Sequence, residues 1–322
     1  MKISTKALST LMATILMICH PISAHPKEIN IVFIPKSSSN TGYWRAVRDG
    51  AQAAAATQAN INFTWRGPAY INDTEAQIKM LQVYTRAGVD VILIAPVHRG
   101  LLAEPMTKAM RLGIKVIVVD SPVEWSNYLQ YISTNNYAAG CLAAKRMSVS
   151  LGGRGSVVVV RTIEGSGSSE ERSRGFIEYI QKYSPNIQIV AKIYAGPTHG
   201  TAFRRALALW KEQPQIDGVF TTNGPSSEGM LLALRQAGIA GKKKFVAFDV
   251  TSLLLKGLEL NEIEGLVLQD PWKIGYIGVR TAMASVANTV HIPKIITLNA
   301  HMVTLENYKN PEIDAQISHQ LK

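Results

Sequence analysis

The chain has 322 residues, of which 47% are hydrophobic and 18% are charged, and it carries a formal net charge of +11 at pH 7. This length suits two lobes better than one, and the composition excludes a disordered or low-complexity chain. The basic residues are spread along the chain, with one short run at Lys242–Lys244. We therefore interpret the positive charge as solvated surface and expect no nucleic-acid partner.

The first residues are typical of a secretory signal peptide. Lys2 and Lys6 precede an apolar run over residues 7–19, and small residues lead up to Ala24. The apolar run is shorter than the roughly 20 residues that a membrane span needs. We expect cleavage near Ala24 and a mature chain in the periplasm. A lipoprotein modified at Cys19 is the alternative, although the residues before it lack the small side chain that lipid attachment requires.

From residue 29 onward, short β-branched runs alternate with amphipathic stretches of helical period. The expected strands are "INIVFI", "VDVILIA", "IKVIVVD", "GSVVVVR", "IQIVAKIY", "DGVFTTN", "KFVAFD" and "GLVLQD". The expected helices cover residues 43–59, 74–87, 101–112, 136–151, 169–183, 201–212 and 226–237. Continuous apolar strands that alternate with helices predict parallel sheets covered on both faces. Right-handed crossovers then give a doubly wound α/β fold.

This pattern occurs twice, once before Pro122 and once after Asn136. We interpret the turn-rich stretch between them as the crossing from one lobe to the other. Two α/β lobes in tandem form a cleft, which is a favoured ligand site. Polar residues follow the ends of strands in both halves, namely Lys36, Asp120, Arg161, Asn223, Asp249 and Gln269. Each alone could be a helix cap or a turn former, but together they predict a polar ring that faces the cleft.

The stretch "RTIEGSGSSEERSRGF" begins like a dinucleotide-binding loop. The third glycine position of that fingerprint is Glu170, which is followed by Glu171. Two carboxylates at a helix start repel phosphate. We therefore interpret the stretch as a turn feeding a helix that directs Arg172 or Arg174 at the cleft.

The residues that an enzyme would need are missing from the sequence. No histidines stand in a metal-ligand pair, and no nucleophile elbow is present. After cleavage only Cys141 remains, so neither a zinc cluster nor an intramolecular disulfide can form. We expect no enzymatic activity, no cofactor and no metal.

The chain resembles the type I periplasmic binding proteins of sugar ABC importers. Its layout is most similar to that of the ribose- and galactose-binding group. The resemblance covers residues 28–310 and rests on the order and spacing of "SSSNTGYWRAVRDGAQAAA", "GVDVILIAP", "IKVIVVDSP", "YISTNNYAAGCLAA", "SSEERSRGF", "DGVFTTN", "KFVAFD" and "GLVLQDPWKIGYIGV". It implies a monomer of two similar doubly wound lobes joined by a three-segment hinge. After a signal peptide over 1–24, one lobe would comprise 25–133 plus 270–298, and the other 134–269 plus 299–322.

The implied function is capture of a monosaccharide-like or polyol ligand between the lobes and delivery to an ABC permease. The alternative is a ligand-sensing periplasmic subunit, for a sugar or an autoinducer-2-like signal, that serves a membrane histidine kinase or chemoreceptor. The cleft chemistry would be the same in both, so the sequence leaves this choice open.

The resemblance also implies the ligand-binding residues. Tyr43 and Trp44 stand where the family places two aromatic rings that sandwich the sugar. The polar positions that match are Asp120, Asn136, Arg172, Asn223, Asp249 and Gln269. Carboxylates, amides and arginine can saturate sugar hydroxyls, which both donate and accept hydrogen bonds.

Several positions depart from the ribose-binding pattern. Ser121 replaces an arginine, Thr41 replaces an asparagine, and Pro197 stands near the place of an expected aromatic residue. Lys36 stands where ribose binders commonly have a small residue. These departures argue against simple ribose specificity, and Lys36 would suit a ligand with an additional acceptor. The alternative for Lys36 is a solvated charge that points outward.

Overall fold

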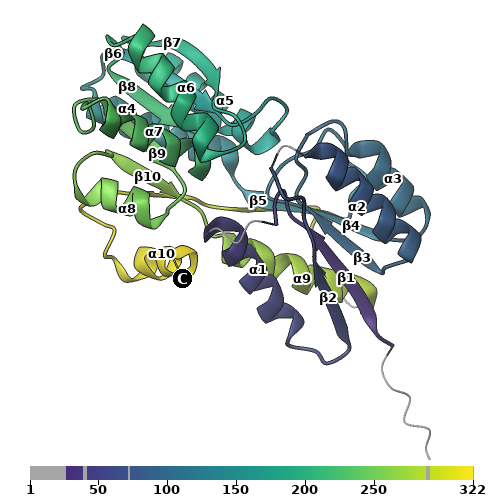
Figure 1. Ribbon diagram of the computed structural model, residues 1–322. Coiled ribbons are helices and arrows are strands. Elements are labelled where there is room, and N and C mark those ends of the chain that lie inside the picture. Colours follow the sequence, from purple (N-terminus) through teal and green to yellow (C-terminus); the bar gives the residue numbers. More distant parts are fainter. Residues whose placement is uncertain (1–26, 39–41, 72, 288–290, 322) are drawn as a thin grey trace, which may run out of the picture.

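The protein is described by a computed structural model that covers residues 27–38, 42–71, 73–287 and 291–321. The expected signal peptide and Thr41 lie outside these residues. Figure 1 shows two α/β lobes side by side, each built around one six-stranded sheet. In the described part of the chain, no helix is long and apolar enough to cross a membrane.

The first sheet is entirely parallel, in the order β11-β5-β4-β3-β1-β2. Its strands are β1 (Ile29–Ile34), β2 (Ile61–Trp65), β3 (Val91–Ile94), β4 (Lys115–Val119), β5 (Gln130–Thr134) and β11 (Ile295–Leu298). Its helices are α1 (Gly42–Ala55), α2 (Thr74–Ala87), α3 (Ala103–Arg111) and α9 (Pro271–Ala287). Ile31 and Phe33 pack toward α1 and α9, whereas Val32 and Ile34 pack toward α2 and α3. This alternation follows from the two-residue period of a strand.

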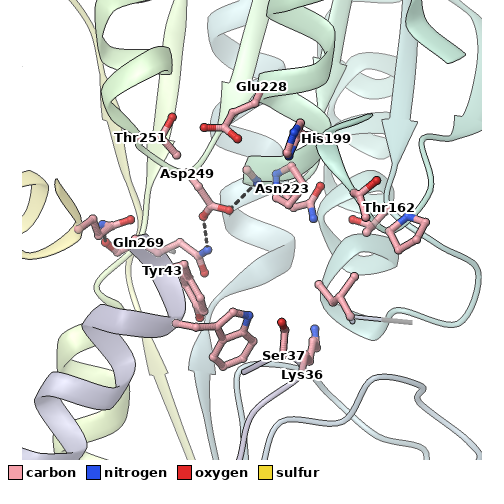
Figure 2. Close-up of a pocket in the computed structure, with 18 of the residues that line it drawn as sticks. Lys36, Ser37, Tyr43, Thr162, His199, Asn223, Glu228, Asp249, Thr251 and Gln269 are labelled. Atoms are coloured by element: carbon pink, nitrogen blue, oxygen red, sulfur yellow. Dashed lines mark hydrogen bonds between the residues drawn. The ribbon is translucent and has the colours of Figure 1, made fainter. Parts of the chain in front are cut away.

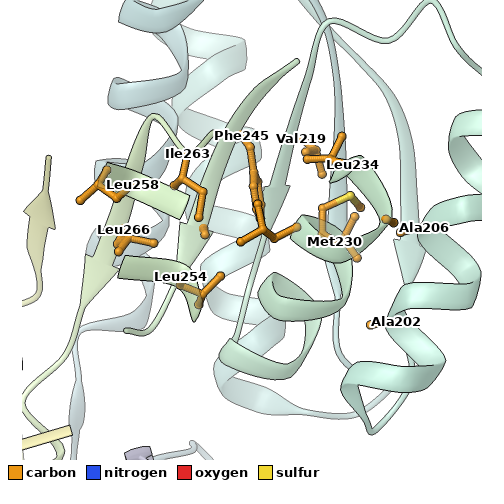
Figure 3. Packing of buried hydrophobic residues seen from close by; sticks show 14 of the residues in the cluster. Ala202, Ala206, Val219, Met230, Leu234, Phe245, Leu254, Leu258, Ile263 and Leu266 are labelled. Atoms are coloured by element: carbon orange, nitrogen blue, oxygen red, sulfur yellow. The ribbon is translucent and has the colours of Figure 1, made fainter. Parts of the chain in front are cut away.

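The second sheet has the order β12-β10-β9-β8-β6-β7 and is parallel except for β12. Its strands are β6 (Gly155–Arg161), β7 (Ile187–Tyr194), β8 (Gly218–Thr221), β9 (Lys244–Phe248), β10 (Gly265–Leu268) and β12 (His301–Val303). Its helices are α4 (Asn136–Ser150), α5 (Gly167–Tyr183), α6 (His199–Glu212), α7 (Gly224–Gln236), α8 (Ser252–Glu259) and α10 (Pro311–Leu321). Figure 3 shows the apolar core beneath α7 and α8, where Phe245 and Leu266 of the sheet meet Leu234, Leu254 and Leu258.

The two-lobed parallel architecture predicted from the sequence is confirmed, and every expected strand is present. The stretch after Pro122 contains the expected crossing between the lobes, but only at its end, after Thr134. Its second half forms β5, which pairs with β4 and β11 inside the first sheet. The sequence of β5, "QYIST", has only two apolar residues, so its strand state depends on its neighbours.

The chain passes between the two sheets after β5, after β10 and after β11. Hydrogen bonds join these three passages to one another. The Asn135 amide donates to the Leu298 carbonyl at 2.8 Å, and the Thr134 hydroxyl donates to Gln269 Oε1 at 2.7 Å. The three passages, which would bend together in a hinge motion, are thus linked at the edge of the cleft. The exact lobe boundaries stay a prediction.

Candidate ligand-binding site

A cavity of about 640 Å³ lies between the two lobes. Its floor is formed by residues that follow the carboxyl ends of parallel strands, where ligands of open α/β sheets bind. Of the residues expected to bind ligand, those that line the cavity are Lys36, Tyr43, Trp44, Asp120, Arg172, Asn223, Asp249 and Gln269. Figure 2 shows several of these side chains converging from both lobes.

The first lobe contributes a buried ion pair. Lys36 Nζ lies 2.9 Å from Asp120 Oδ2, and both side chains are only 6% exposed. The Tyr43 hydroxyl donates to Asp120 Oδ1 at 2.5 Å. Burial raises the pKa of Asp120, but the charges of Lys36 and Arg172 outweigh it and hold that pKa below its ordinary value. Asp120 is therefore ionised at neutral pH, and the alternative of an outward-pointing Lys36 is wrong.

Asp120 adopts an unusual backbone conformation for a residue with a side chain. Its φ of 64° lies in the left-handed region, which asparagine and aspartate tolerate better than other non-glycine residues. Asp249 has the same feature at the corresponding strand end of the second lobe, with a φ of 67°. The two carboxylates therefore leave their strands through similar local turns.

The aromatic pair is arranged differently from what the resemblance implied. The rings of Tyr43 and Trp44 are nearly perpendicular, at 89°, with centroids 5.1 Å apart. They leave no room for a sugar ring between them, so the expected sandwich of these two rings is wrong. Burial, followed by the nearby Asp120 charge, raises the pKa of Tyr43. Its hydroxyl therefore stays protonated and acts as a donor.

Arg172 is the central cation of the second lobe and is 4% exposed. It donates from Nε to Asn136 Oδ1 at 2.8 Å, from Nη1 to the Thr222 carbonyl at 2.9 Å, and from Nη2 to Gln269 Oε1 at 2.9 Å. Its guanidinium carbon lies 3.8 Å from the centroid of the Phe248 ring. Asn136 thus holds Arg172 from behind and does not line the cavity.

Glycines place Arg172 at this depth. A Cβ atom on Gly140 would lie 2.0 Å from the Arg172 carbonyl oxygen, and one on Gly175 would lie 2.1 Å from the Tyr137 carbonyl oxygen. The backbones of α4 and α5 can therefore touch only because both positions are glycine. Arg174, the other candidate on this helix, has a 57% exposed side chain near Glu178.

Asp249 completes the polar floor. It accepts from the Gly224 amide at 2.7 Å and from Gln269 Nε2 at 2.6 Å. Burial raises the pKa of Asp249, although Arg172 and both hydrogen bonds oppose that shift. Asn223 has two roles. It lines the cavity, and its Oδ1 accepts a hydrogen bond from the Ser226 amide and so caps the start of α7.

The two lobes touch along one side of the cavity, through the loop that precedes α5 and the first turn of that helix. The Ser168 amide donates to Ser121 Oγ at 3.0 Å, and Lys36 Nζ donates to Ser168 Oγ at 3.1 Å. The Arg99 amide donates to the Gly165 carbonyl at 2.9 Å. Ser121, which departs from the ribose-binding pattern, therefore forms part of a contact between the lobes.

Sequence reasoning also misplaced one residue and missed others. Arg161 lies outside the cavity, because it pairs with Glu170 at 3.0 Å and stacks on Tyr194. The lining residues that were missed include Ser168, His199, Glu228, Thr251 and Gln320. Gln320 comes from α10, whose paired isoleucines four residues apart, Ile313 and Ile317, were the available signal of an amphipathic helix.

The C-terminal helix α10 bridges the lobes on the other side of the cavity. The Gln320 carbonyl accepts from Arg45 Nη2 of α1 at 2.9 Å, and its side chain donates to the Gln269 carbonyl at 3.1 Å. Among the residues that the structure describes, no group of three or more His, Cys, Asp or Glu side chains is placed to hold a metal ion.

Comparisons with known proteins agree with this geometry. The periplasmic binding protein domain family matches residues 31–289. Among curated proteins, the xylitol-binding protein of Mycolicibacterium smegmatis is 29% identical over 66% of this chain, and this chain spans 60% of that relative. The ribose import binding protein RbsB of Haemophilus influenzae is 24% identical over 81% of this chain and 87% of the relative.

Two solved structures are similar along nearly their whole length. An ABC transporter solute binding protein from Agrobacterium vitis with bound D-fucose is 30% identical with a TM-score of 0.86, and the match covers 91% of this chain and 100% of that one. A carbohydrate transporter solute binding protein from Agrobacterium radiobacter in complex with D-arabinose is 28% identical, also with a TM-score of 0.86, over 90% and 99% of the two chains. The fold, the cleft and the family match together show that this chain belongs to the periplasmic binding protein family.

Proposed function

We propose that the protein captures a monosaccharide-like or polyol ligand between its lobes in the periplasm and delivers it to an ABC permease. The observation that supports this most strongly is the convergence of buried polar groups from both lobes on one cavity. Lys36, Asp120 and Tyr43 come from one lobe, and Arg172 and Asp249 come from the other.

The donor and acceptor inventory suits a polyhydroxylated ligand. Two of the three N–H donors of Lys36 are engaged, by Asp120 and Ser168, so the third is available to a ligand. Asp120 and Asp249 each accept two hydrogen bonds from the protein side and retain lone pairs for ligand hydroxyls. The rings of Tyr43 and Trp44 offer apolar surface to the C–H groups of a sugar.

The charged groups are already paired before ligand binds. An isolated buried charge is costly, whereas a paired and hydrogen-bonded one is tolerated. The pairs Lys36–Asp120 and Arg172–Gln269 therefore fix the site in advance and reduce the ordering that ligand binding requires. A ligand that bonds to both lobes stabilises the closed arrangement about the three linked passages.

Uptake is proposed ahead of sensing because several relatives are import binding proteins by name, such as those for ribose and for D-apiose. The two roles differ in their membrane partner. Affinity purification from detergent extracts of the native membrane should recover a permease with its ATPase. Recovery of a histidine kinase or chemoreceptor in their place would support the sensing role.

The ligand is tested by thermal-shift and calorimetric screening of residues 25–322 against pentoses, hexoses, deoxysugars and polyols, including D-arabinose, D-fucose, D-allose and xylitol. A ligand at 100 times its dissociation constant stabilises the folded state by about 2.7 kcal/mol, which raises the melting temperature by several degrees. Arg172→Ala should remove about 2–5 kcal/mol of binding free energy. Arg174→Ala, on the same helix but exposed, is the matched control. The proposal would be overturned if no compound of the panel binds, or if Arg172→Ala binds the ligand with wild-type affinity.

A further inference from the structure

The cavity is larger than one sugar requires. A monosaccharide of twelve non-hydrogen atoms has about the volume of six water molecules, roughly 180 Å³ at about 30 Å³ per water. The cavity of about 640 Å³ is roughly three times larger. The cavity is open to solvent on part of its surface, and a single sugar on the polar floor would leave room in it for water or for a second unit.

Further closure of the lobes would not remove this excess on the side where they already meet. A Cβ atom on Gly167 would lie 2.7 Å from the Pro122 carbonyl oxygen, and one on Gly165 would lie 2.4 Å from the His98 ring. On the opposite side, a Cβ atom on Gly42 would lie 2.6 Å from the Gln320 carbonyl oxygen. Both flanks of the cavity are thus closed at van der Waals contact.

A second set of polar side chains lines the part of the cavity that the polar floor does not use. We call His199, Glu228, Thr251 and Ser252 the outer group. They stand at the start of α6, in the first half of α7 and at the start of α8. Figure 2 shows His199 and Glu228 at the end of the cavity opposite Lys36 and Ser37.

The outer group differs from the polar floor in its pairing. On the floor, the charges of Lys36, Asp120, Arg172 and Asp249 all have protein partners. In the part of the chain that the structure describes, neither the half-buried Glu228 carboxylate nor the exposed His199 imidazole has a hydrogen-bond or ion-pair partner. A carboxylate that lines a cavity without a protein partner is available to accept hydrogen bonds from a ligand.

We propose that the outer group binds a second sugar-sized unit, so that the site also takes a disaccharide whose first unit occupies the polar floor. The inference rests on the proposed function, since the first unit occupies the polar floor described there. Glu228 accepts from hydroxyl groups of the second unit, and His199 can donate to one and accept from another. Pro225 and Leu253, which line the same part of the cavity, contact its C–H face.

Isothermal titration calorimetry of residues 25–322 tests this by comparing single sugars with disaccharides that contain them. The panel is D-glucose, D-galactose, D-xylose and L-arabinose against cellobiose, maltose, lactose, melibiose, xylobiose and arabinobiose. At least one disaccharide should bind about tenfold or more tightly than either of its component sugars, the size expected for one added bond to a charged group.

Variants assign that gain to the outer group. Glu228→Gln keeps the side-chain size and removes the charge, so it should weaken the best disaccharide by about tenfold and single sugars by less than about twofold. Glu212→Gln is the matched control, because Glu212 is exposed in the same lobe and lies outside the cavity. Circular dichroism of each variant confirms that it is folded.

The outcomes separate the two proposals. Absence of binding by every sugar and disaccharide would overturn the proposed function. A single sugar that binds while no disaccharide containing it binds more tightly would overturn the two-unit ligand alone. Equal disaccharide affinity in the wild type and in Glu228→Gln would overturn the assignment of the second unit to the outer group.

Discussion

Replacing Asp120 with asparagine tests the buried ion pair most directly. Asparagine has the same shape and tolerates the left-handed φ of 64° at this position, so the change adds little backbone strain. It removes the negative charge that Lys36 faces and leaves the ammonium group buried without an ionic partner. The free energy of unfolding of the ligand-free protein should fall by about 3–5 kcal/mol.

The magnitude follows from the geometry of the pair. Unit charges 2.9 Å apart attract by about 6 kcal/mol at an effective dielectric constant of about 20. Desolvation of both groups offsets part of that attraction when the pair forms. When only Asp120 is lost, the desolvation of Lys36 remains without compensation, and the Tyr43 hydroxyl meets an amide in place of a charged acceptor.

Urea unfolding at neutral pH, followed by far-ultraviolet circular dichroism, measures the loss. The double variant Lys36→Met with Asp120→Asn should recover about 1–3 kcal/mol relative to the sum of the single changes, because the unpaired ammonium is gone. The difference between wild type and Asp120→Asn should shrink in acid. The pKa of Asp120 is lowered in the folded state, so its contribution is present above the ordinary value of 3.8 and is lost as the pH falls through the lowered value. Strictly additive single changes, or a pH-independent difference, would refute the reasoning.

Three further predictions concern the ligand. The affinity for the ligand should decline as the pH falls, beginning above pH 3.8, because burial raises the pKa of Asp249 and its carboxylate takes up a proton earlier than an exposed one. In calorimetric titrations, Asp249→Asn should remove this pH dependence. A wild-type affinity that does not change with pH would contradict the prediction. Gly167→Ala should weaken ligand binding by about 1–3 kcal/mol, because the added methyl group would lie 2.7 Å from the Pro122 carbonyl oxygen and push the lobes apart. Small-angle X-ray scattering should then show that the ligand-bound variant is more open than the ligand-bound wild type. Ligand should change the tryptophan emission of the wild type but not of Trp44→Phe, since Trp44 lines the cavity. If ligand changes the emission of Trp44→Phe as much as that of the wild type, another tryptophan is the reporter.

The strands differ in how far their own residues predict them. β3 and β4 are fully or almost fully buried, and their sequences are nearly continuous apolar runs. Such runs are typical of strands that are covered on both faces of the sheet. β11 and β12 are short and partly exposed, at sheet edges, and β12 runs antiparallel to its neighbour. Their strand state depends on the partner that they pair with, and no local pattern records that partner.

The polar ring could be predicted because the carboxyl ends of parallel strands meet at one edge of a sheet. That rule brings Asp120, Asp249 and Gln269 to the cleft without further information. The same rule misplaced Arg161, which follows β6 but turns away to Glu170 and Tyr194. A strand end fixes the position of a residue, whereas the direction of its side chain depends on register and on available partners.

The amino-acid sequence by itself determined the two parallel α/β lobes and the polar strand ends, because these depend on local periodicity and residue type. It left open whether Arg172 or Arg174 faces the cleft and whether Lys36 is solvated. Tertiary structure decided both, since Lys36 meets Ser168 across 132 positions of the chain and Arg172 is held by Asn136 and Gln269. It also brought His199, Glu228 and Gln320 to the cavity. Such contacts join residues far apart in sequence, and they exist only once the lobes and the C-terminal helix have packed together.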